Sequence, residues 1–415
     1  MDTYMPFRVG KWLPQDRRII NNWLQDLIVE VEHTPKHIHP IIQELQNMIE
    51  TDAKLFMLFQ LMFEQVPIKY KTNPAGGKQI RDYKHALSLL NYIMTKAPEF
   101  NLTGLVGFPI NAIFDWSMGT TAGFAAFLDD KFNRQLQKVL DEWAKFLESK
   151  DSAYVLNDNP RSGWFGEDAQ KAMPNFVEEF KCDPEKPHYG FTSWDDFFTR
   201  EFREGVRPIA EPENDNVIVN ACESAPYRVV GKISLRNKFW IKGQEYSLQH
   251  LLNDDPYTET FLKGTIYQAF LSALSYHRWH SPVSGTIKKA YKIEGTYYSE
   301  TLAEGFDPSG PNKSQGYIAE VATRALIFIE ADNPEIGLMC FIPIGMAEVS
   351  TCDITVYEGQ HVKKGDQLGM FHFGGSTHCL LFQSRVKLKF DFHGQEPGLG
   401  SKNIPINSRI ATVVE

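Results

Sequence analysis

The sequence has 415 residues, of which 42% are hydrophobic, 13% aromatic and 23% charged, and its formal net charge is −9. This composition is that of a globular protein and excludes a fibrous or disordered chain. The acidic balance leaves no surplus of lysine and arginine to neutralise phosphates, which argues against a nucleic-acid partner and against binding to an anionic membrane. A chain of this length exceeds the usual size of one hydrophobic core, so we expect two domains.

Five cysteines are scattered along the chain without a C-x-x-C pair. This spacing predicts reduced thiols in a cytoplasmic protein, with neither a zinc site nor a disulfide framework. Residues 1–18 lack the apolar core of a signal peptide. The most apolar stretch, 102–128, is interrupted by a proline, polar residues and glycines, so we expect a buried pair of helices there and no membrane span.

Apolar residues recur at helical spacing through the first third of the chain. The predicted helices cover residues 19–31, 40–49, 55–62, 81–96 and 131–149. Pro40 is favoured in the first turn of a helix, and Thr51 and Asp52 are candidates to cap the third one. No group of residues suited to catalysis stands out here. We therefore expect residues 1–150 to form a helical N-terminal domain that serves packing or regulation.

Turn-forming residues dominate the transitional segment 151–215, and short β-rich runs alternate with glycine and proline turns in residues 216–415. The segments 349–355 and 358–369 resemble the hairpin of barrel-sandwich domains, which carry biotin or lipoate. No lysine lies at the hairpin tip, so we expect this protein to share the hairpin structure of those domains but not their function as carriers. The sequence thus predicts an α+β fold, with a helical N-terminal domain followed by a β-rich domain.

The segment Gly374-Gly375-Ser376-Thr377 can carry out chemistry on its own backbone. Two glycines allow unusual backbone angles and leave the Gly375 carbonyl open to attack by the Ser376 hydroxyl. Attack converts the amide into an ester, elimination leaves dehydroalanine, and hydrolysis releases ammonia and leaves a pyruvoyl group. The route needs a nearby base. Most such segments are turns or phosphate loops, so the motif alone decides nothing.

His277 and His280, in Tyr276-His277-Arg278-Trp279-His280, are candidates for that base. A histidine near its ordinary pKa accepts a serine proton at neutral pH. If the segment is extended the two rings face different sides, and if it is helical they share one side. Two structural histidines beside a proline turn are the alternative. A metal pair is a further alternative, but no third ligand cluster is evident nearby.

Four segments resemble, in the same order, motifs of the phosphatidylserine decarboxylase family. They are residues 191–209, 242–252, 276–282 and 374–377, which look like F-x-x-F-F-x-R…R-P-I, K-G-x-x-Y-S-L…L-L, Y-H-R-x-H-x-P and G-S-T. The resemblance implies cleavage between Gly375 and Ser376, with a long chain 1–375 holding a short chain 376–415. It also implies a pyruvoyl cofactor made from Ser376, without pyridoxal phosphate. His280 matches the family's processing base, and His277 matches a histidine associated with decarboxylation.

Three departures from the family's pattern affect the site. Glu223 stands in Asn220-Ala221-Cys222-Glu223-Ser224, where the family has Pro-Ala-Asp-Gly. It either replaces the aspartate of a triad or ends a surface strand, and the sequence leaves both readings open. The family's Asn-Glu-Arg appears as Ala322-Thr323-Arg324, which keeps only the arginine. Glu348 adds a carboxylate to a segment that is glycine-rich in the family, and it would change the polarity of the pocket if it points inward.

A pyruvoyl ketone supplies the electron sink for decarboxylating any α-amino acid, so the sequence specifies the reaction more firmly than the substrate. The acidic helical extension and the segments around Glu223, His280 and Ser376 resemble the soluble fungal L-tryptophan decarboxylase branch of the family. This resemblance implies a free aromatic amino acid, tryptophan first, as a small-molecule substrate in secondary metabolism. Tyr297 and Tyr298 are candidates to contact its ring, although adjacent tyrosines on a strand can also point one in and one out.

Two other functions stay open. In the first, the substrate is phosphatidylserine and the helical part docks on a bilayer, which the lack of a basic amphipathic helix disfavours. In the second, the chain is an uncut scaffold or binding protein. An exposed apolar face of the sheet would favour a homo-oligomer.

Overall fold

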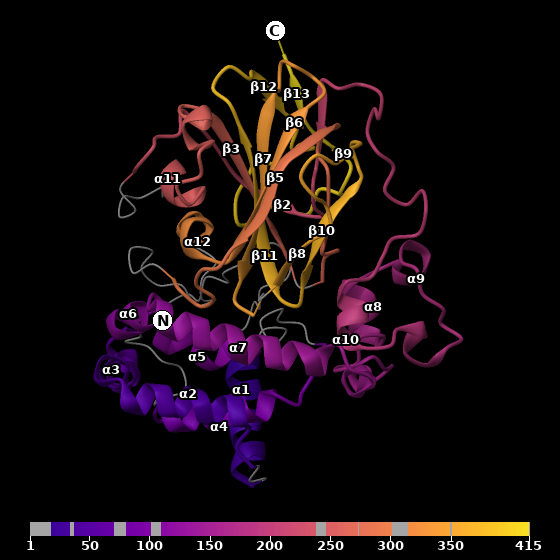
Figure 1. Ribbon diagram of the computed structural model, residues 1–415. Coiled ribbons are helices and arrows are strands. Elements are labelled where there is room, and N and C mark those ends of the chain that lie inside the picture. Colours follow the sequence, from indigo (N-terminus) through magenta and orange to yellow (C-terminus); the bar gives the residue numbers. More distant parts are fainter. Residues whose placement is uncertain are drawn as a thin grey trace, which may run out of the picture.

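The computed structural model describes residues 18–33, 37–69, 80–100, 109–237, 246–272, 274–300, 314–348 and 351–414. The helices of the first part of the chain gather at one end of the molecule, and the strands extend away from them toward the C-terminus (Figure 1). We call the described residues between 18 and 198 the helical half and those from 217 onward the β-rich half. The α+β prediction is confirmed.

Seven helices form the first part of the helical half. They are α1 (Arg18–His33), α2 (Pro40–Thr51), α3 (Ala53–Lys69), α4 (Tyr83–Ile93), α5 (Pro109–Met118), α6 (Thr121–Phe127) and α7 (Asp130–Leu147). Of the two predicted caps, Asp52 is the actual one, because its carboxylate accepts hydrogen bonds from the Lys54 and Leu55 backbone N–H groups. Thr51 is the last residue of α2 instead. The expected pair in the apolar stretch is α5 and α6, while residues 102–108 lie outside the described residues.

Short helices follow α7 and lie beside its C-terminal end (Figure 1). They are η1 (Lys150–Val155), α8 (Glu167–Ala172), α9 (Phe176–Glu179), η2 (Pro187–Gly190) and α10 (Trp194–Phe198). One hydrophobic core runs through the helical half from Leu24 to Phe198, and it also takes in Tyr298, Ala347 and Phe373 from the β-rich half. The helical half therefore packs directly against segments that join the strands. The division of the chain into domains at residues 150 and 215 stays a prediction.

The β-rich half contains one large and two small sheets with antiparallel pairing. Its strands are β1 (Val217–Val219), β2 (Ala225–Gly231), β3 (Thr265–Leu271), β4 (Arg278–His280), β5 (Gly285–Ile293), β6 (Arg324–Ala331), β7 (Leu338–Met346), β8 (Thr351–Ile354), β9 (His361–Val362), β10 (Gln367–His372), β11 (Gly375–Phe382), β12 (Leu388–Phe390) and β13 (Arg409–Val413). The strand orders are β2-β3-β11-β7-β6-β5-β9, β1-β13-β12 and β4-β10-β8. Strand β11, which carries the predicted cleavage site, is thus an interior strand of the large sheet.

Each face of the large sheet is covered. On one face lie α11 (Leu248–Leu251), η3 (Thr258–Phe261) and α12 (Gln315–Val321), whose apolar residues share a core with the sheet. On the other face a second core joins the large sheet to the two small ones, with Trp279 of β4 and Ile410 of β13 among its members. Alternation along a strand therefore sends successive residues of β11 into different cores.

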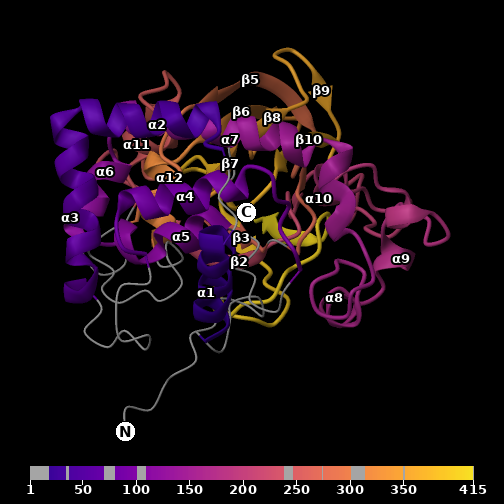
Figure 2. The same ribbon diagram turned by 90° about the horizontal axis from the view of Figure 1, so that it is seen from below.

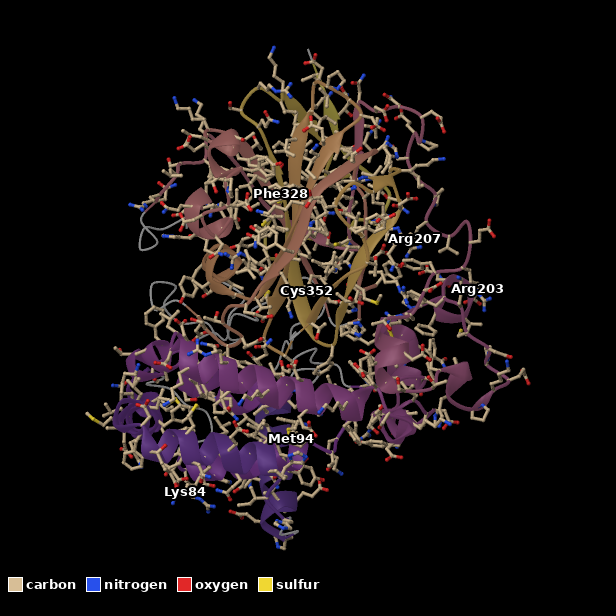
Figure 3. The ribbon with its side chains drawn as sticks, viewed as in Figure 1. Lys84, Met94, Arg203, Arg207, Phe328 and Cys352 are labelled. Carbon is tan, nitrogen blue, oxygen red and sulfur yellow. The ribbon has the colours of Figure 1, made fainter. Side chains whose placement is uncertain are left out.

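The hairpin prediction is confirmed with a change in pairing. Strand β8 pairs with β10 in antiparallel fashion, whereas the short β9 between them pairs with β5. Cys352 of β8 lies at the end of the strands that is nearest the helices (Figure 3). Viewed from the helical end, α2, α4, α5 and α7 lie across the strands (Figure 2). The β8–β10 pair thus ends close to the helical half, and the chain then turns into β11.

Candidate active site

Ser376 is the second residue of β11, held on both sides by neighbouring strands. It lies opposite Leu271 of β3 and Gly345 of β7. The side chain is 1% exposed, and its hydroxyl makes no hydrogen bond to any residue that the structure describes. Because Gly345 has no side chain, no side chain of β7 lies directly opposite the hydroxyl. The nucleophile predicted from the sequence is therefore buried, fixed in a sheet and free of hydrogen bonds within the described part of the chain.

The turn that precedes Ser376 has an unusual backbone. Phe373 has φ 40° and Gly374 has φ 119°, both in the region that L side chains rarely adopt. Glycine accepts this freely, but the phenylalanine must be held there by its surroundings. The Phe373 ring makes edge-to-face contacts with Trp143 of α7 and Trp194 of α10, with centroids 4.6 and 4.7 Å apart. The sequence pointed to the glycines, and the strained residue next to them is Phe373.

His277 lies beside this turn. Its backbone carbonyl accepts a hydrogen bond from the Phe371 N–H (2.9 Å), and its ring stacks on Phe198 with centroids 3.8 Å apart. Phe198 in turn contacts Phe373. Burial, assisted by the charge of Arg200, lowers the pKa of His277 well below its ordinary value. The ring is therefore a neutral imidazole next to the residues that lead into the Gly375–Ser376 bond.

His280 occupies the other end of β4, which confirms the extended reading of this segment. It lies opposite Gln367 at the start of β10, whereas Ser376 follows the end of β10. Its Nδ1 lies 2.7 Å from the Gly365 carbonyl, so Nδ1 carries the proton and Nε2 accepts the Tyr276 hydroxyl at 3.0 Å. Burial lowers its pKa. Both ring nitrogens are thus engaged, and neither of them by Ser376.

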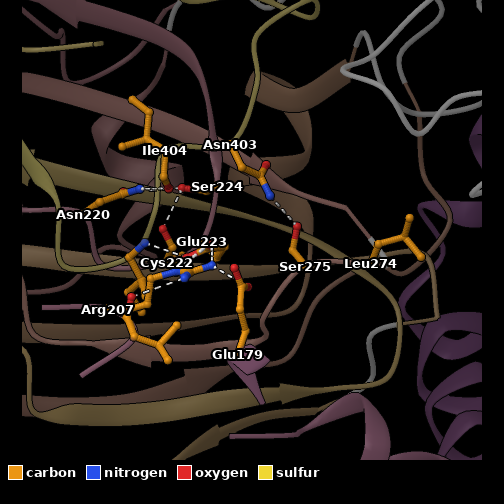
Figure 4. A network of polar contacts seen from close by, with 12 residues as sticks. Glu179, Arg207, Asn220, Cys222, Glu223, Ser224, Leu274, Ser275, Asn403 and Ile404 are labelled. Atoms are coloured by element: carbon orange, nitrogen blue, oxygen red, sulfur yellow. Dashed lines mark hydrogen bonds and ion pairs between the residues drawn. The ribbon is translucent and has the colours of Figure 1, made fainter. Parts of the chain in front are cut away.

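Glu223 is buried, which removes the reading as a surface residue. Its carboxylate forms an ion pair with Arg207 (Nη2–Oε1 2.9 Å) and accepts a hydrogen bond from the Ile406 N–H (2.7 Å) (Figure 4). Arg207 also contacts Glu179 of α9 at 3.0 Å. Burial raises the pKa of Glu223, and Arg207 partly offsets this shift. In the described contacts, the carboxylate therefore meets Arg207 and not the imidazole of His280.

Arg207 belongs to the R-P-I motif, and sequence reasoning gave it no role. It lies between the β-rich half and the short helices of the helical half (Figure 3). Its guanidinium also lies over the Phe202 ring at 4.3 Å. A buried carboxylate needs such a partner, because an unpaired buried charge is costly. Glu223, in the segment that differs from the family's motif, was therefore the signal in the sequence that an arginine had to lie nearby.

Comparisons with known proteins identify the family of this chain. A family model described as phosphatidylserine decarboxylase matches residues 194–402, and a second model of similar description matches residues 39–173. The chain is 40% identical to an L-tryptophan decarboxylase of Psilocybe cubensis over 378 residues, which cover 86% of this chain and 83% of the relative. The chain belongs to the phosphatidylserine decarboxylase family. It is a decarboxylase, and hence a carboxy-lyase.

Two further relatives cover most of this decarboxylase. An L-tryptophan decarboxylase of Psilocybe cyanescens is 38% identical, over 98% of this chain and 95% of the relative. The decarboxylase iboD of Amanita muscaria is 43% identical, over 74% of this chain and 91% of the relative. A phosphatidylserine decarboxylase proenzyme of Schizosaccharomyces pombe is more distant, with 33% identity over 52% of this chain. The two L-tryptophan decarboxylases and iboD thus cover more of this chain than the phosphatidylserine decarboxylase proenzyme does.

His378 is a buried residue of the site that sequence reasoning missed. It follows Ser376 by two positions in β11, so both side chains face the same side of the sheet. Its Nε2 lies 2.9 Å from the Ser224 hydroxyl, and its Nδ1 has no hydrogen-bond partner within the described part of the chain. Burial lowers its pKa to about 3, so the ring is neutral. The sequence held one signal for it: residues two positions apart in a strand face the same side, so a histidine two positions after Ser376 lies beside it.

Glu348 points into the protein, which is one of the possibilities that the sequence left open. Its hydrogen-bond partners are backbone groups of a helix. Its Oε1 accepts hydrogen bonds from the Ile110 and Asn111 N–H groups at 2.7 and 2.9 Å, in the first turn of α5. Burial raises its pKa to about 8. Beside it, Tyr298 packs against Phe114 of α5, and both Tyr297 and Tyr298 are buried. Neither tyrosine therefore points to solvent, and their contact with a substrate ring stays a prediction.

Arg324, the residue retained from the family's Asn-Glu-Arg segment, holds α11 in place. Its guanidinium donates to the backbone carbonyls of His250 and Leu251 at 2.6 and 2.9 Å. Residues 242–245, from the motif that leads into α11, lie outside the described residues. A groove of about 810 Å³ between α6, α7, α11 and α12 is lined by Arg324, Tyr297 and Glu320, among others. It lies on the α12 side of the large sheet, opposite to the side that Ser376 faces.

Within the described residues, one group of three potential metal ligands lies close together, formed by Glu148, Asp195 and His372. Burial alone would lower the pKa of His372, but its contact with Asp195 (3.0 Å) and the charge of Asp353 raise it above the ordinary value. His277 and His280 do not belong to this group. All five cysteines are free. Among the helices that the structure describes, none is both long and apolar enough to cross a membrane.

Proposed function

We propose that this decarboxylase cuts itself between Gly375 and Ser376 and then uses the pyruvoyl group formed from Ser376 to decarboxylate a free aromatic amino acid, with L-tryptophan giving tryptamine. The observation that carries the proposal is the buried Ser376 hydroxyl, which is free of hydrogen bonds to described residues and directly follows a strained turn. Such strain is typical of functional sites. No pyridoxal phosphate is needed, because a pyruvoyl ketone supplies the electron sink.

The self-cleavage proceeds by rearrangement of the chain's own atoms. Ser376 Oγ adds to the Gly375 carbonyl carbon, its proton passes to a base, and the C–N bond breaks to leave an ester and a free amine on Ser376. Loss of the Ser376 α-proton expels the Gly375 carboxylate and leaves dehydroalanine. Water then hydrolyses its imine form, which releases ammonia and leaves the keto group. Gly345 opposite Ser376 and the free hydroxyl fit this rearrangement.

The roles of the acid and base residues are proposed from the family motifs. His280 is the processing base, with Glu223 as its acid, and His277 moves a proton during decarboxylation. Nε2 of His280 is an acceptor, and it is occupied by the Tyr276 hydroxyl, so action on Ser376 requires that hydrogen bond to open. The Glu223 carboxylate is paired with Arg207 in the uncut chain, so its action on His280 requires that pair to open. The ring of His277 lies beside Phe371 and Phe198 and is neutral, so it has a lone pair that can accept a proton, but burial makes it a weak base.

Intact mass tests self-cleavage directly. The purified protein is expected as two chains, 1–375 and 376–415, with a mass deficit on the second that corresponds to a pyruvoyl end. Ser376→Ala should stay whole, while Ser384→Ala, an exposed serine of the same short chain, should be cut like the wild type. A single 47.5 kDa species in the wild type would overturn the proposal. A cut Ser376→Ala variant would move the site elsewhere.

Carbon dioxide release identifies the substrate. We expect release from L-tryptophan, because relatives at 40% and 38% identity carry the name L-tryptophan decarboxylase. The assay includes L-tyrosine and vesicles of phosphatidylserine, the substrate class named by the more distant relatives. Release from the vesicles alone would assign the protein to lipid synthesis. The free cysteines fit the cytoplasmic location that we also propose.

A further inference from the structure

We propose that the helical half positions the scissile bond for self-cleavage, through Phe373 on the upstream side of Gly375 and through Glu348 at the end of the strand that pairs with Gly375. The inference rests on the self-cleavage proposed above and assigns a role to the helices. They supply no acid, base or nucleophile to this step, but they fix the two chain segments between which the reacting atoms lie.

The upstream contact is aromatic. The Phe373 ring lies between Trp143 of α7 and Trp194 of α10, in edge-to-face contact with both. Trp143 is itself fixed, because its indole N–H donates to the Lys96 carbonyl at 2.9 Å. Next to Phe373, His372 Nδ1 pairs with Asp195 of α10 at 3.0 Å. The two residues that lead into Gly374 and Gly375 are therefore both held by the helical half.

The second contact lies across the sheet. Met346, the last residue of β7, is directly opposite Gly375 in β11. Two residues later, the buried Glu348 carboxylate accepts the Ile110 and Asn111 N–H groups of α5. These N–H groups have no partner inside their own helix, so the Glu348 carboxyl oxygen satisfies two donors that would otherwise be unpaired. Glu348 thus anchors the end of β7 to α5 over a separation of 238 residues in sequence.

Both contacts act on the same peptide bond. Downstream of it, Ser376 is fixed by β3 and β7, and upstream of it, Gly375 follows a turn whose positive φ at Phe373 costs free energy unless packing holds it. Attack by Oγ requires the reacting atoms about 3–3.5 Å apart in the correct direction. Loss of either anchor lets the turn relax to ordinary backbone angles, and Gly375 then leaves the position from which it can be attacked.

The test follows the appearance of the chain 376–415 after synthesis of the full-length protein, by intact mass at fixed times. Trp143→Ala and Glu348→Ala are each expected to slow cleavage by about tenfold to a hundredfold, the range typical of a small misplacement of reacting groups. Glu348→Gln keeps an oxygen that can accept both N–H groups of α5, so it should restore most of the wild-type rate. Glu348→Met keeps a similar volume without an oxygen acceptor, so it should stay slow, whereas a residue that served packing alone would be rescued by Met as well as by Gln.

Two matched controls separate positioning from loss of stability. Leu45→Ala empties part of the core of the helical half in α2, a helix that supplies neither of the two contacts, and Glu335→Ala removes an exposed carboxylate ahead of β7. Both should cut at nearly the wild-type rate. Each rate is measured at the same number of degrees below the midpoint of thermal unfolding of that variant. Phe373→Leu provides a milder change at the turn itself.

The outcomes distinguish this inference from the proposed function. If the wild type is not cut at Gly375–Ser376, the proposed self-cleavage fails. If the wild type is cut and the Trp143, Phe373 and Glu348 variants are cut equally fast, or if Leu45→Ala slows cleavage as much as Trp143→Ala, the positioning role is wrong. Slow cleavage in the anchor variants, with rescue by Glu348→Gln and normal controls, supports it.

Discussion

Glu348 is a buried carboxyl group whose titration should appear in the stability of the protein. Its pKa is about 8 in the folded chain, against an ordinary value of 4.5. Between these values the folded state holds a proton that the unfolded chain has lost, so the free energy of unfolding falls as pH rises through this window, by up to about 1.4 kcal/mol for each unit. Below the window the contribution is complete, and above it the contribution is lost.

Glu348→Gln removes this titration, because the amide is neutral at every pH. The free energy of unfolding, measured by urea denaturation from pH 5 to 9, should therefore fall less steeply in the variant. Some slope remains, since burial also raises the pKa of Glu320 to about 8. Parallel curves for the wild type and Glu348→Gln would show that Glu348 titrates normally in the folded chain.

Arg207 should be important for stability because of Glu223. Removing the guanidinium leaves a buried carboxylate without its ion partner, which typically costs about 3–5 kcal/mol. We expect a loss of this size for Arg207→Ala in urea denaturation, and a smaller loss when Glu223→Gln is combined with it. Arg409→Ala is the control, because its partners Glu211 and Asp391 are exposed and such pairs contribute about 0–1 kcal/mol. Equal losses in the two arginine variants would contradict the argument.

At the scale of elements, the helices were the most predictable part of the chain. Helical spacing of apolar residues placed α2 and α7 within a few residues of their ends. The cap of α3 shows the limit of a prediction from local sequence. Thr51 and Asp52 are both good capping residues, and only the course of the backbone decides which of them caps the helix. A hairpin pattern likewise predicted β8 and β10. The short strand β9 between them pairs with β5 instead, and no local sequence pattern predicts this contact.

The cap gives a prediction of its own. Asp52→Ala should destabilise the protein by about 1 kcal/mol, because two N–H groups at the start of α3 lose their acceptor. Thr51→Ala, one residue earlier at the exposed end of α2, should change stability by less than about 0.5 kcal/mol. Thermal unfolding of the two variants side by side measures the difference. A larger effect for Thr51→Ala would reverse the assignment of the cap.

The site was predictable where short motifs carry it and not where distant segments meet. Ser376, His277 and His280 stand in motifs that can be read from neighbouring residues. The partners of Glu223 and Phe373 could not be read in this way, because Arg207 and Trp143 are distant in sequence and share no periodicity with them. His378 falls between these cases. Alternation along a strand predicts that its side chain lies on the same face of the sheet as Ser376, but not that it is buried against Ser224.

For the whole molecule, the arrangement of strands decides what self-cleavage would leave behind. The chain 376–415 contains all of β11 except Gly375, and it pairs with β3 along Ser376–Phe382 and with β7 along Ser376–Leu381. It also contains β13, which pairs with β1. Leu380, Leu381 and Phe382 are completely buried, and each contributes about 1.5–3 kcal/mol by leaving water. Cutting the peptide bond ahead of an interior strand removes none of these contacts.

We therefore expect the cut protein to behave as one particle. The chains 1–375 and 376–415 should elute together on gel filtration in native buffer and separate only in concentrated urea, as followed by the mass of each fraction. Uncut Ser376→Ala gives the comparison, because it elutes as a single chain under both conditions. Loss of the short chain in native buffer would mean that the pairing of β11 with β3 and β7 does not survive cleavage, and that the interior position of this strand belongs to the uncut chain alone.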